Sequence, residues 1–218
     1  MKMPSVTQGQ HNFAQVPQAN IPRSVFNRSH SHKTTFDAGY LIPFYVDEAL
    51  PGDTFNLNAT IFSRMTTPIY PIMDNLYMDI HYFFVPLRLL WTNFQAFMGE
   101  QLTPLTPTDY RTPKVNALAA GGWVNGSLSD YFGLPTGINS LSSVAFWHRA
   151  YNKIWNDWYR DENLQTKLIE NMGDGPDAAT DYVLQRRGKR HDYFTSALPW
   201  PQKGPAVSLP LGTSTPIS

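Results

Sequence analysis

Two pairs of residues are spaced so that they could do chemistry together. His30 and His32 stand two residues apart in a polar stretch, where two imidazoles on one side of an extended chain could ligate a metal. Asp79 and His81 have the same spacing in an expected strand and could form an acid–base pair. A zinc site needs three or four organised ligands, and no nucleophile stands beside Asp79 and His81. We therefore favour a solvated arm for the first pair and structural hydrogen bonding for the second.

Other catalytic and binding motifs are missing from the sequence. The segment 173-GDGPD-177 lacks the alternating acidic series and the terminal glutamate of an EF-hand loop, so we interpret it as a turn. There is no Walker loop, no dinucleotide-binding glycine fingerprint, no HExxH and no GxSxG. The sequence has no cysteine, which excludes disulfides, thiolate metal sites and cysteine nucleophiles. We expect a protein that is not an enzyme and carries no cofactor or metal.

Basic residues gather in two places. Residues 1–33 contain Lys and Arg but neither Asp nor Glu, in a polar, proline-broken setting that predicts a flexible N-terminal arm. The second place is 186-RRGKRH-191. Lys and Arg neutralise phosphates and a flexible arm can follow a single strand, so both places are candidate nucleic-acid contacts; a solvated loop at a subunit contact is the alternative. The candidate residues are Arg23, Arg28, Lys33, Arg186, Arg187, Lys189 and Arg190.

The overall composition favours association with other protein. Lys plus Arg and Asp plus Glu both number 17, so the net charge is zero, and charged residues make up 16%, against about 25% in ordinary globular domains. With few charges to keep copies apart, we expect other protein to cover much of the exterior. The N-terminus lacks the apolar core of a signal peptide, and no apolar run approaches the ~20 residues of a membrane helix. We expect a cytoplasmic product without membrane association.

The pattern after the arm predicts strands on both sides of a turn. In 54-TFNLNATIF-62 polar and apolar residues alternate, as in a half-buried strand. The run before it contains Pro43, which cannot donate a ladder hydrogen bond and belongs at a sheet edge or a bulge. The expected strands are Tyr40–Val46, Thr54–Phe62 and Tyr77–Val85, with one or two further candidates near Tyr182–Leu184 and Val207–Leu209.

Two helices are expected between the later strands. Segment 88–101 has apolar residues at helical spacing and predicts a short helix that Gly99 ends. Segment 141–163 predicts the strongest helix, and a serine at 140, 142 or 143 can cap its start. We predict mostly loop over 102–139, where prolines and glycines are frequent. The aromatic stripe of the second helix is expected to be largely buried and consists of Trp147, Tyr151, Trp155 and Trp158.

Three blocks of the sequence resemble one family of viral proteins. Residues 34–55, TTFDAGYLIPFYVDEALPGDTF, look like the N-terminal signature of the major capsid proteins of the Microviridae, particularly the gokushovirus branch of these bacteriophages. Residues 150–165 resemble that family's Ala-Tyr-Asn helix ending in Arg-Asp-Glu-Asn. Residues 189–205 resemble its Arg-His-Asp-Tyr-Phe motif followed by Leu-Pro-x-Pro-Gln-Lys-Gly. The blocks follow the family's order, and the similarity covers the whole chain.

The resemblance implies a mainly β protein, a viral jelly-roll β-sandwich with long loop and helix insertions. Many copies would close a small T=1 icosahedral shell around a circular single-stranded DNA genome. The partners would be the protein itself, the DNA and other virion proteins, with assembly in the host bacterial cytoplasm and a final place in the virion. No catalytic residue is implied. The aromatic stripe would then pack against the sandwich or a neighbouring subunit.

The domain organisation expected from this resemblance is an arm over 1–33 followed by one jelly-roll domain over 34–218. About 88–180 would be the loop and helix insertion. Family members are more than twice as long, and only three strands are confidently expected, whereas a jelly roll needs eight. We therefore expect an incomplete sandwich, the N-terminal part of a longer capsid protein, which does not assemble a shell alone.

Two other classes of protein compete with the capsid interpretation. A carbohydrate-binding or adhesive β-sandwich could use an aromatic loop such as 121-GGWVNG-126 to stack on sugars. A sandwich-type glycoside hydrolase would need two carboxylates ~5–10 Å apart in a cleft. The basic, acid-free arm favours the capsid interpretation, and a secretion signal, which would favour the adhesive module, is missing.

Overall fold

The chain divides into two units, Met1–Thr34 and Thr35–Ser218. A computed structural model describes residues 22–105, 107, 109–188, 190–200, 204–205 and 212. In the first unit, the described residues 22–34 are exposed and contain neither helix nor strand. All the regular structure among the described residues therefore belongs to the second unit.

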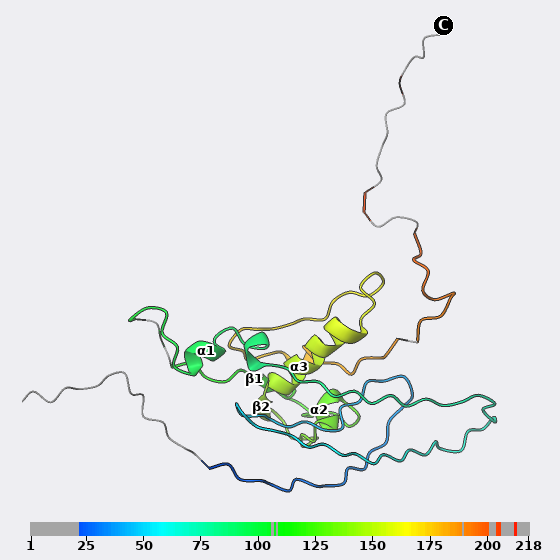
Figure 1. The fold of residues 1–218 in the computed structure, drawn as a ribbon, viewed down its shortest axis with the longest axis horizontal. Coiled ribbons are helices and arrows are strands. Elements are labelled where there is room, and N and C mark those ends of the chain that lie inside the picture. Colours follow the sequence, from blue (N-terminus) through cyan, green and yellow to red (C-terminus); the bar gives the residue numbers. More distant parts are fainter. Residues whose placement is uncertain are drawn as a thin grey trace, which may run out of the picture. The chain divides into compact units, whose positions relative to one another are not determined.

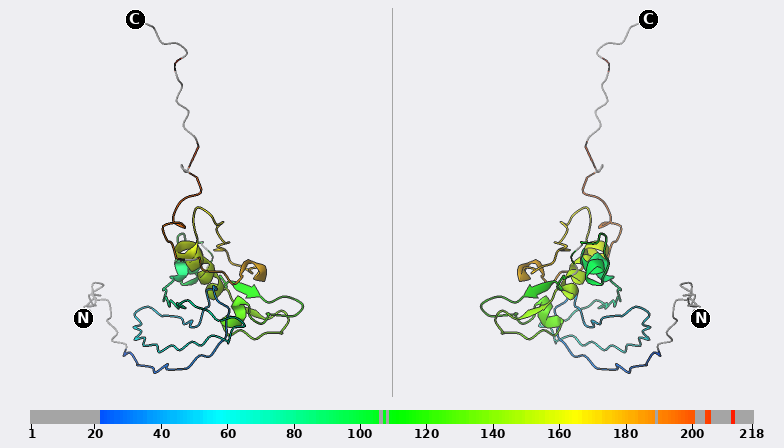
Figure 2. Two further views of the ribbon diagram at one scale, coloured as in Figure 1. Left: turned by 90° about the vertical axis from the view of Figure 1, so that its right-hand side faces the viewer. Right: turned by 90° about the vertical axis from the view of Figure 1, so that its left-hand side faces the viewer.

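The second unit has short helices and one small sheet within its described residues (Figure 1). In Figure 2 the green and yellow part of the chain gathers into a cluster, whereas the cyan part, near residues 50–75, leaves it as a long open loop. The elements in chain order are η1 (Leu87–Leu89), α1 (Phe94–Phe97), β1 (Lys114–Asn116), α2 (Leu128–Tyr131), β2 (Ser142–Val144), α3 (Phe146–Ile154), the π-helix η2 (Trp155–Tyr159) and η3 (Ala179–Asp181).

Strands β1 and β2 pair antiparallel, with Val115 opposite Ser143. The backbone N–H of Ala145 donates to Pro113 O at 3.0 Å, which continues the pairing to the start of α3. On its other side Val115 forms an isolated parallel bridge with Asp177. This small sheet therefore joins the start of α3 to the turn at 173–177, because β1 contacts both.

Two apolar clusters pack on α3. The first contains Val115, Trp123, Leu128 and Tyr182, with Tyr151 of α3 packed against it. The second contains Leu90, Trp91 and Phe146, where Phe146 is the first residue of α3. Burying a large apolar side chain stabilises a fold by about 1.5–3 kcal/mol. The helix is therefore held on two sides by residues far from it in the sequence.

None of the three expected strands Tyr40–Val46, Thr54–Phe62 and Tyr77–Val85 forms among the described residues, and those predictions are wrong for this structure. A single antiparallel bridge joins Tyr40 to Arg186. Alternation predicts which side chains share a face, but a strand also needs a partner for its backbone groups, and the described residues supply none. Tyr182–Leu184 is likewise not a strand, and Val207–Leu209 lies outside the described residues. A jelly roll is not present in the described part of the chain.

The predicted helices form, but with different limits. Segment 88–101 contains only the end of η1 and the whole of α1 as helical elements. Gly99 follows the end of α1 with φ 100°, a conformation that glycine adopts without strain. Helix α3 begins at Phe146 instead of 141 because Ser142–Val144 pair as β2. Its N-cap is Ala145, without a side-chain cap, so the expected serine cap is wrong. The expected loop 102–139 contains β1 and α2, whose N-cap Ser127 accepts from Asp130 N.

Candidate functional site

A buried ion pair lies at the centre of the second unit. Arg149 of α3 donates from Nε and Nη2 to the two carboxylate oxygens of Asp177, both at 2.7 Å. The two side chains are 1% and 0% exposed. Arg149 Nη1 also donates to Leu90 O at 2.8 Å, at the end of η1. One guanidinium therefore binds two segments, 59 and 28 residues away along the chain.

Two further donors complete this polar centre, which we define as Arg149, Asp177, Asn171 and Tyr182. The hydroxyl of Tyr182 donates to Asp177 Oδ2, and the amide of Asn171 donates to Asp177 Oδ1. Burial alone would lower the pKa of Arg149, but its hydrogen bond to Asp177 and the charge of that carboxylate outweigh burial, and the pKa is raised. Burial, together with Asp177, raises the pKa of Tyr182. The centre is thus a buried ion pair in which both carboxylate oxygens accept hydrogen bonds, and this suits a structural role.

The turn 173-GDGPD-177 does more than reverse the chain. Besides Asp177 it supplies Asp174, which accepts from Trp91 Nε1 at 2.7 Å and from Asn93 Nδ2 at 2.8 Å. The hydrogen bond from Trp91 is the main reason why the pKa of Asp174 is lowered. The interpretation as only a turn was therefore incomplete, since its carboxylates join α3 and the segment around α1. No sequence motif signalled this, because the partners lie more than 80 residues away.

His148 is a second buried polar residue of α3. Its Nε2 lies 2.9 Å from Ser129 Oγ, and its ring contacts those of Trp123, Phe132 and Tyr182 at 5.8, 5.2 and 5.3 Å between centroids. Burial lowers the pKa of His148 to about 4. The ring is therefore neutral near pH 7 and packs as part of an aromatic cluster.

The predicted basic patch is paired with aromatic and acidic residues of the second unit. Arg187 forms an ion pair with Asp79, and Arg190 reaches the same carboxylate at 2.8 Å. Hydrogen bonds from Arg190 and then Arg187 lower the pKa of Asp79. The guanidinium of Arg186 lies 4.6 Å from the ring centroid of Tyr40. These contacts join the segment 185–190 to the segments around Tyr40 and Asp79, while Lys189 lies outside the described residues.

Asp79 and His81 do not form a pair with each other in this structure. His81 Nδ1 lies 2.6 Å from the hydroxyl of Tyr159. The two rings also stack, with 5.9 Å between their centroids. Asp79 binds the two arginines of the patch. Both residues therefore have structural hydrogen bonds, each to a residue distant in the sequence.

The arm candidates Arg23, Arg28 and Lys33 are exposed in the first unit. His30 Nδ1 lies 2.9 Å from Arg28 O. Within the described residues, no group of three His, Cys, Asp or Glu side chains could hold a metal ion. Nucleic-acid contact by the arm stays a prediction, because no nucleic acid is part of the structure.

The aromatic stripe of the expected helix divides between the interior and the surface. Trp155 is buried, and Trp147 and Tyr151 are half-buried. Trp158 is 72% exposed and contacts Phe83 at 5.8 Å between ring centroids. Its burial against a neighbouring subunit stays a prediction. The face of α3 and η2 that is buried also carries polar side chains that the pattern did not single out: His148, Arg149, Asn152 and Asn156.

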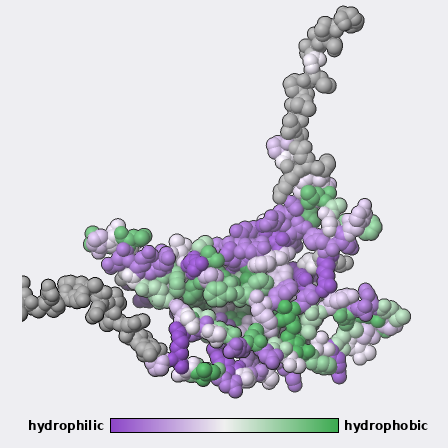
Figure 3. All heavy atoms as spheres, viewed as in Figure 1, coloured by the Kyte–Doolittle hydropathy of each residue, from purple (hydrophilic) through white to green (hydrophobic). Residues whose placement is uncertain are grey.

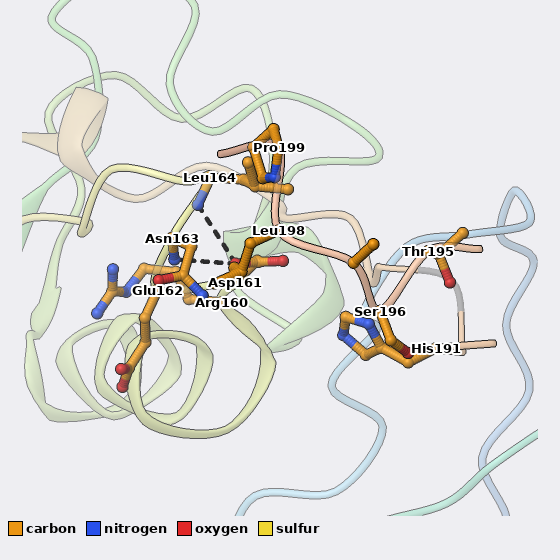
Figure 4. Close-up of a pocket in the computed structure, with 11 residues that line it drawn as sticks. Arg160, Asp161, Glu162, Asn163, Leu164, His191, Thr195, Ser196, Leu198 and Pro199 are labelled. Carbon is orange, nitrogen blue, oxygen red and sulfur yellow. Dashed lines mark hydrogen bonds between the residues drawn. The ribbon is translucent and has the colours of Figure 1, made fainter. Parts of the chain in front are cut away.

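One pocket among the described residues lies between two of the blocks that carry the family resemblance. It has a volume of about 280 Å³ and is lined by residues 160–164 and by His191 with residues 195–199 (Figure 4). Asp161 Oδ1 accepts from the backbone N–H groups of Asn163 and Leu164, so this carboxylate holds its own loop. The pocket is open, and Thr195 in its lining donates from Oγ1 to Asp192 Oδ1 at 3.0 Å. The same oxygen accepts from the backbone N–H groups of Phe194 and Thr195, so this contact holds its own turn and supports no catalytic role.

Large apolar side chains are exposed along the segment that follows Tyr40. Residues 54–62 and 76–84 run in opposite directions on either side of the loop 63–75 (Figure 1). Exposed side chains along these two segments and the loop include Phe55, Leu57, Phe62, Ile69, Met73, Leu76, Met78 and Phe84. Figure 3 shows green, hydrophobic residues distributed among hydrophilic ones over the visible face. Exposed apolar surface of this extent is typical of protein that another polypeptide covers.

Comparison with known proteins identifies the family. Residues 14–218 match the family described as "Capsid protein (F protein)". The chain belongs to this family. It is 50% identical over 209 residues to "Capsid protein VP1" of Bdellovibrio phage phiMH2K, and 47% identical over 229 residues to "Capsid protein VP1" of Chlamydia phage 1. A third relative, "Capsid protein VP1" of Spiroplasma virus 4, is 33% identical over 230 residues.

The alignments cover 96%, 95% and 100% of this chain but 39%, 38% and 41% of the three relatives, respectively. The chain thus spans about two fifths of the length of the curated relatives it matches. The predicted identity as a major capsid protein of the Microviridae is confirmed, and the family suggests a β-rich viral fold. All three relatives carry the name of a structural capsid protein. A capsid protein is a component of the virion.

The competing adhesive module is not favoured by the structure. Trp123, the aromatic residue of the loop 121–126, is 6% exposed and stacks on His148, so its face is not open to a sugar. Within the described residues, no helix has the length and apolar character needed to cross a membrane.

Proposed function

We propose that this chain is part of a major capsid protein whose copies associate into a small T=1 icosahedral shell around circular single-stranded DNA. The observation that carries the proposal is the family match over residues 14–218, with capsid proteins of three phages as relatives. The composition supports it, since a chain with 17 basic and 17 acidic residues has little net charge to separate its copies. Other virion proteins would be further partners.

The structure supports this function by combining a fixed centre with uncovered surface. The polar centre and the two apolar clusters hold α3, β1 and the turn at 173–177 together. In contrast, the segment 54–84 exposes apolar side chains and has no ladder partner within the described residues. A subunit whose apolar segments are covered only in an assembly would associate readily with its own copies.

The DNA-binding part of the proposal places phosphate contacts on the arm. Arg23, Arg28 and Lys33 are exposed and stand in a segment without acidic residues. Arg187 and Arg190 already share Asp79, so binding phosphate there would compete with an existing ion pair. We assign phosphate contact to the exposed arm because it contains no acidic residue, and we assign the patch at 186–190 to joining segments of the subunit.

The test uses the protein expressed from its complete gene. Particles are sought by sedimentation and electron microscopy, and their nuclease-protected DNA is measured. Reversing Arg23, Arg28 and Lys33 to Glu should lower the DNA content and reduce the slope of log affinity for single-stranded DNA against log salt by about 2, since each phosphate contact contributes about 0.7. If the parent protein forms no closed particles, the proposed shell is contradicted, even if the arm variant binds DNA less tightly as expected.

A matched control keeps the change in net charge the same. Arg88, Arg111 and Lys114 are exposed cations of the second unit and are not candidates for DNA contact. Their reversal to Glu should leave the DNA content and the salt slope close to those of the parent. Equal losses in the two triple variants would show that net charge, and not the arm, determines DNA content.

A further inference from the structure

The loop 63–75, here named the apolar loop, presents large apolar side chains at the surface of the second unit. Ile69, Tyr70 and Met73 are 94%, 81% and 95% exposed, and Met65 and Ile72 are also exposed. The loop contains neither helix nor strand. Its sequence, 63-SRMTTPIYPIMDN-75, has two prolines among the apolar residues. Prolines restrict the backbone, so this loop would lose less conformational entropy on binding a partner than a flexible loop would.

A missing sheet partner explains the exposure of 54–62 and 76–84, but not that of the apolar loop. Those two segments alternate, so one side of each would face a sheet interior once paired. The apolar loop does not alternate, and its prolines remove backbone donors that a ladder requires. Exposed apolar patches of this kind mark surfaces that bind protein.

The charges of the loop indicate what kind of protein fits. Arg64 and Asp74 are its only side chains of the Lys, Arg, Asp or Glu type and stand near its two ends. Asp74 accepts from the backbone N–H of Asn75 at 2.7 Å, whereas Arg64 has no hydrogen bond or ion pair within the described part of the chain. A surface with one cation, one anion and an apolar middle is complementary to another copy of itself, because each arginine can meet the aspartate of the other copy.

We propose that the apolar loop is a contact between copies of this chain, in which it packs on the same loop of a second copy and Arg64 of one copy pairs with Asp74 of the other. The inference rests on the proposed shell, which supplies the second copy. Ile69, Tyr70 and Met73 form the apolar centre of the contact, and the two charges at its rim set the register. Rim charges govern specificity more than affinity, so reversing one of them should misalign the contact.

Charge reversal and its compensation form the first test. In the protein from its complete gene, Arg64→Asp and Asp74→Arg should each lower the yield of closed particles at least ~10-fold, since each places like charges opposite one another. The double variant restores opposite charges and should return the yield to within about threefold of the parent, by the logic of a double-mutant cycle. Arg88→Asp is the control, an exposed cation outside the loop, and should not change the yield. Circular dichroism of the free subunits checks that every variant folds as the parent does.

Thiol labelling provides the second test, because the chain has no cysteine of its own. In Ile69→Cys, the introduced thiol should react freely in isolated subunits and at least ~10-fold more slowly in particles. Oxidation of these particles should give disulfide-linked dimers, since the two loops face each other. The same protein labelled after denaturation supplies the reference rate.

The outcomes separate the contact from the shell. Particles in which position 69 stays reactive overturn the apolar loop as a contact and leave the shell intact. Protection of position 69 without rescue in the double variant also overturns the proposal, because the covering surface is then not the same loop. Absence of particles from the parent protein contradicts the proposed function itself, and with it the inference.

Discussion

Replacing Asp177 by Asn tests whether the polar centre holds the second unit together. The substitution keeps the size of the side chain but removes its charge and turns one acceptor into a donor. All four groups that reach this carboxylate are donors: Arg149 Nε, Arg149 Nη2, the Asn171 amide and the Tyr182 hydroxyl. Whichever oxygen becomes the amide nitrogen, an N–H of Arg149 then faces another N–H.

The expected loss follows from this geometry. Breaking a buried ion pair by removing one partner costs about 3–5 kcal/mol, because the remaining charge is left uncompensated in the interior. The side chains of Arg149 and Asp177 are 1% and 0% exposed, so water cannot replace the lost contact without opening the structure. The loss of two hydrogen bonds to a charged group, at about 1.5–3 kcal/mol each, gives a similar figure.

Native-state hydrogen exchange measures this loss locally in the protein from its complete gene. The reporters are the amides of Arg149, which donates to Ala145 O, and of position 177, which donates to Lys114 O. A loss of about 3–5 kcal/mol corresponds to exchange roughly 100 to 4,000 times faster, since every 1.4 kcal/mol is tenfold. Asp79→Asn is the matched control, because that carboxylate also binds two arginines but lies at the surface. Its effect should be much smaller, as is usual for exposed pairs.

Equal effects of Asp177→Asn and Asp79→Asn would refute the reasoning, because burial would then not matter. A second test is the double variant Arg149→Met with Asp177→Leu. Replacing both members of a buried pair by apolar residues of similar volume is often neutral or stabilising, so the double variant should lose less than either single variant. A double variant that loses the sum of the two single losses would show that the residues do not act as a pair.

Three further outcomes are expected. The pKa of His148 is about 4 in the folded chain, against 6.5 ordinarily. The unfolded chain therefore binds more protons between pH 6.5 and 4, and up to about 3 kcal/mol of stability, present above pH 6.5, should be lost as the pH falls through that range. His148→Phe combined with Ser129→Ala should flatten the pH profile in urea unfolding. Trp123→Ala should lower the free energy of unfolding by about 3–5 kcal/mol in the same assay, because Trp123 is buried. Trp158→Ala should mainly reduce particle yield, because Trp158 is exposed. A larger loss of unfolding free energy for Trp158→Ala than for Trp123→Ala would contradict the observed burial. Residues 1–218 expressed alone should sediment as aggregates or unfold without one sharp transition, and a monomer that melts sharply would contradict this.

The sequence pattern located the main helix but not its buried face. Aromatic residues at helical spacing drew attention to Trp147, Tyr151 and Trp158, yet these are half-buried or exposed. The interior instead contains Arg149 and Asn152, along with the buried Trp155. Asn152 Nδ2 donates to backbone oxygens of Ile169 and Asp181, at 3.0 and 3.1 Å. Polar residues are buried when they find such partners, and hydrophobic periodicity cannot reveal a partner that lies elsewhere in the chain.

The expected strands fail to form among the described residues for a related reason. The alternation of Thr54–Phe62 predicts a segment with two different faces, but all of its residues are exposed and none lies in a strand. A pattern within one segment specifies the faces of a strand, whereas the ladder depends on a second segment at the right distance and in register. The basic patch shows the same limit. Its spacing suggested phosphate, but Asp79, more than 100 residues earlier, occupies two of its arginines.

Contacts around Tyr151 explain how the three blocks that carry the family resemblance work as one structure. The hydroxyl of Tyr151, in the second block, donates to Leu41 O of the first block at 2.9 Å and accepts from the backbone N–H of Gln185, shortly before the third block, at 2.9 Å. Burial raises the pKa of this phenol to about 12, so the hydroxyl keeps its proton near pH 7 and can donate. The bridge between Tyr40 and Arg186 lies directly beside these contacts. Since Leu41 begins the segment that leads to the apolar loop, the helix fixes the base of that segment while its apolar side chains stay uncovered. In the proposed contact with a second copy, a fixed base would lower the entropy lost on binding.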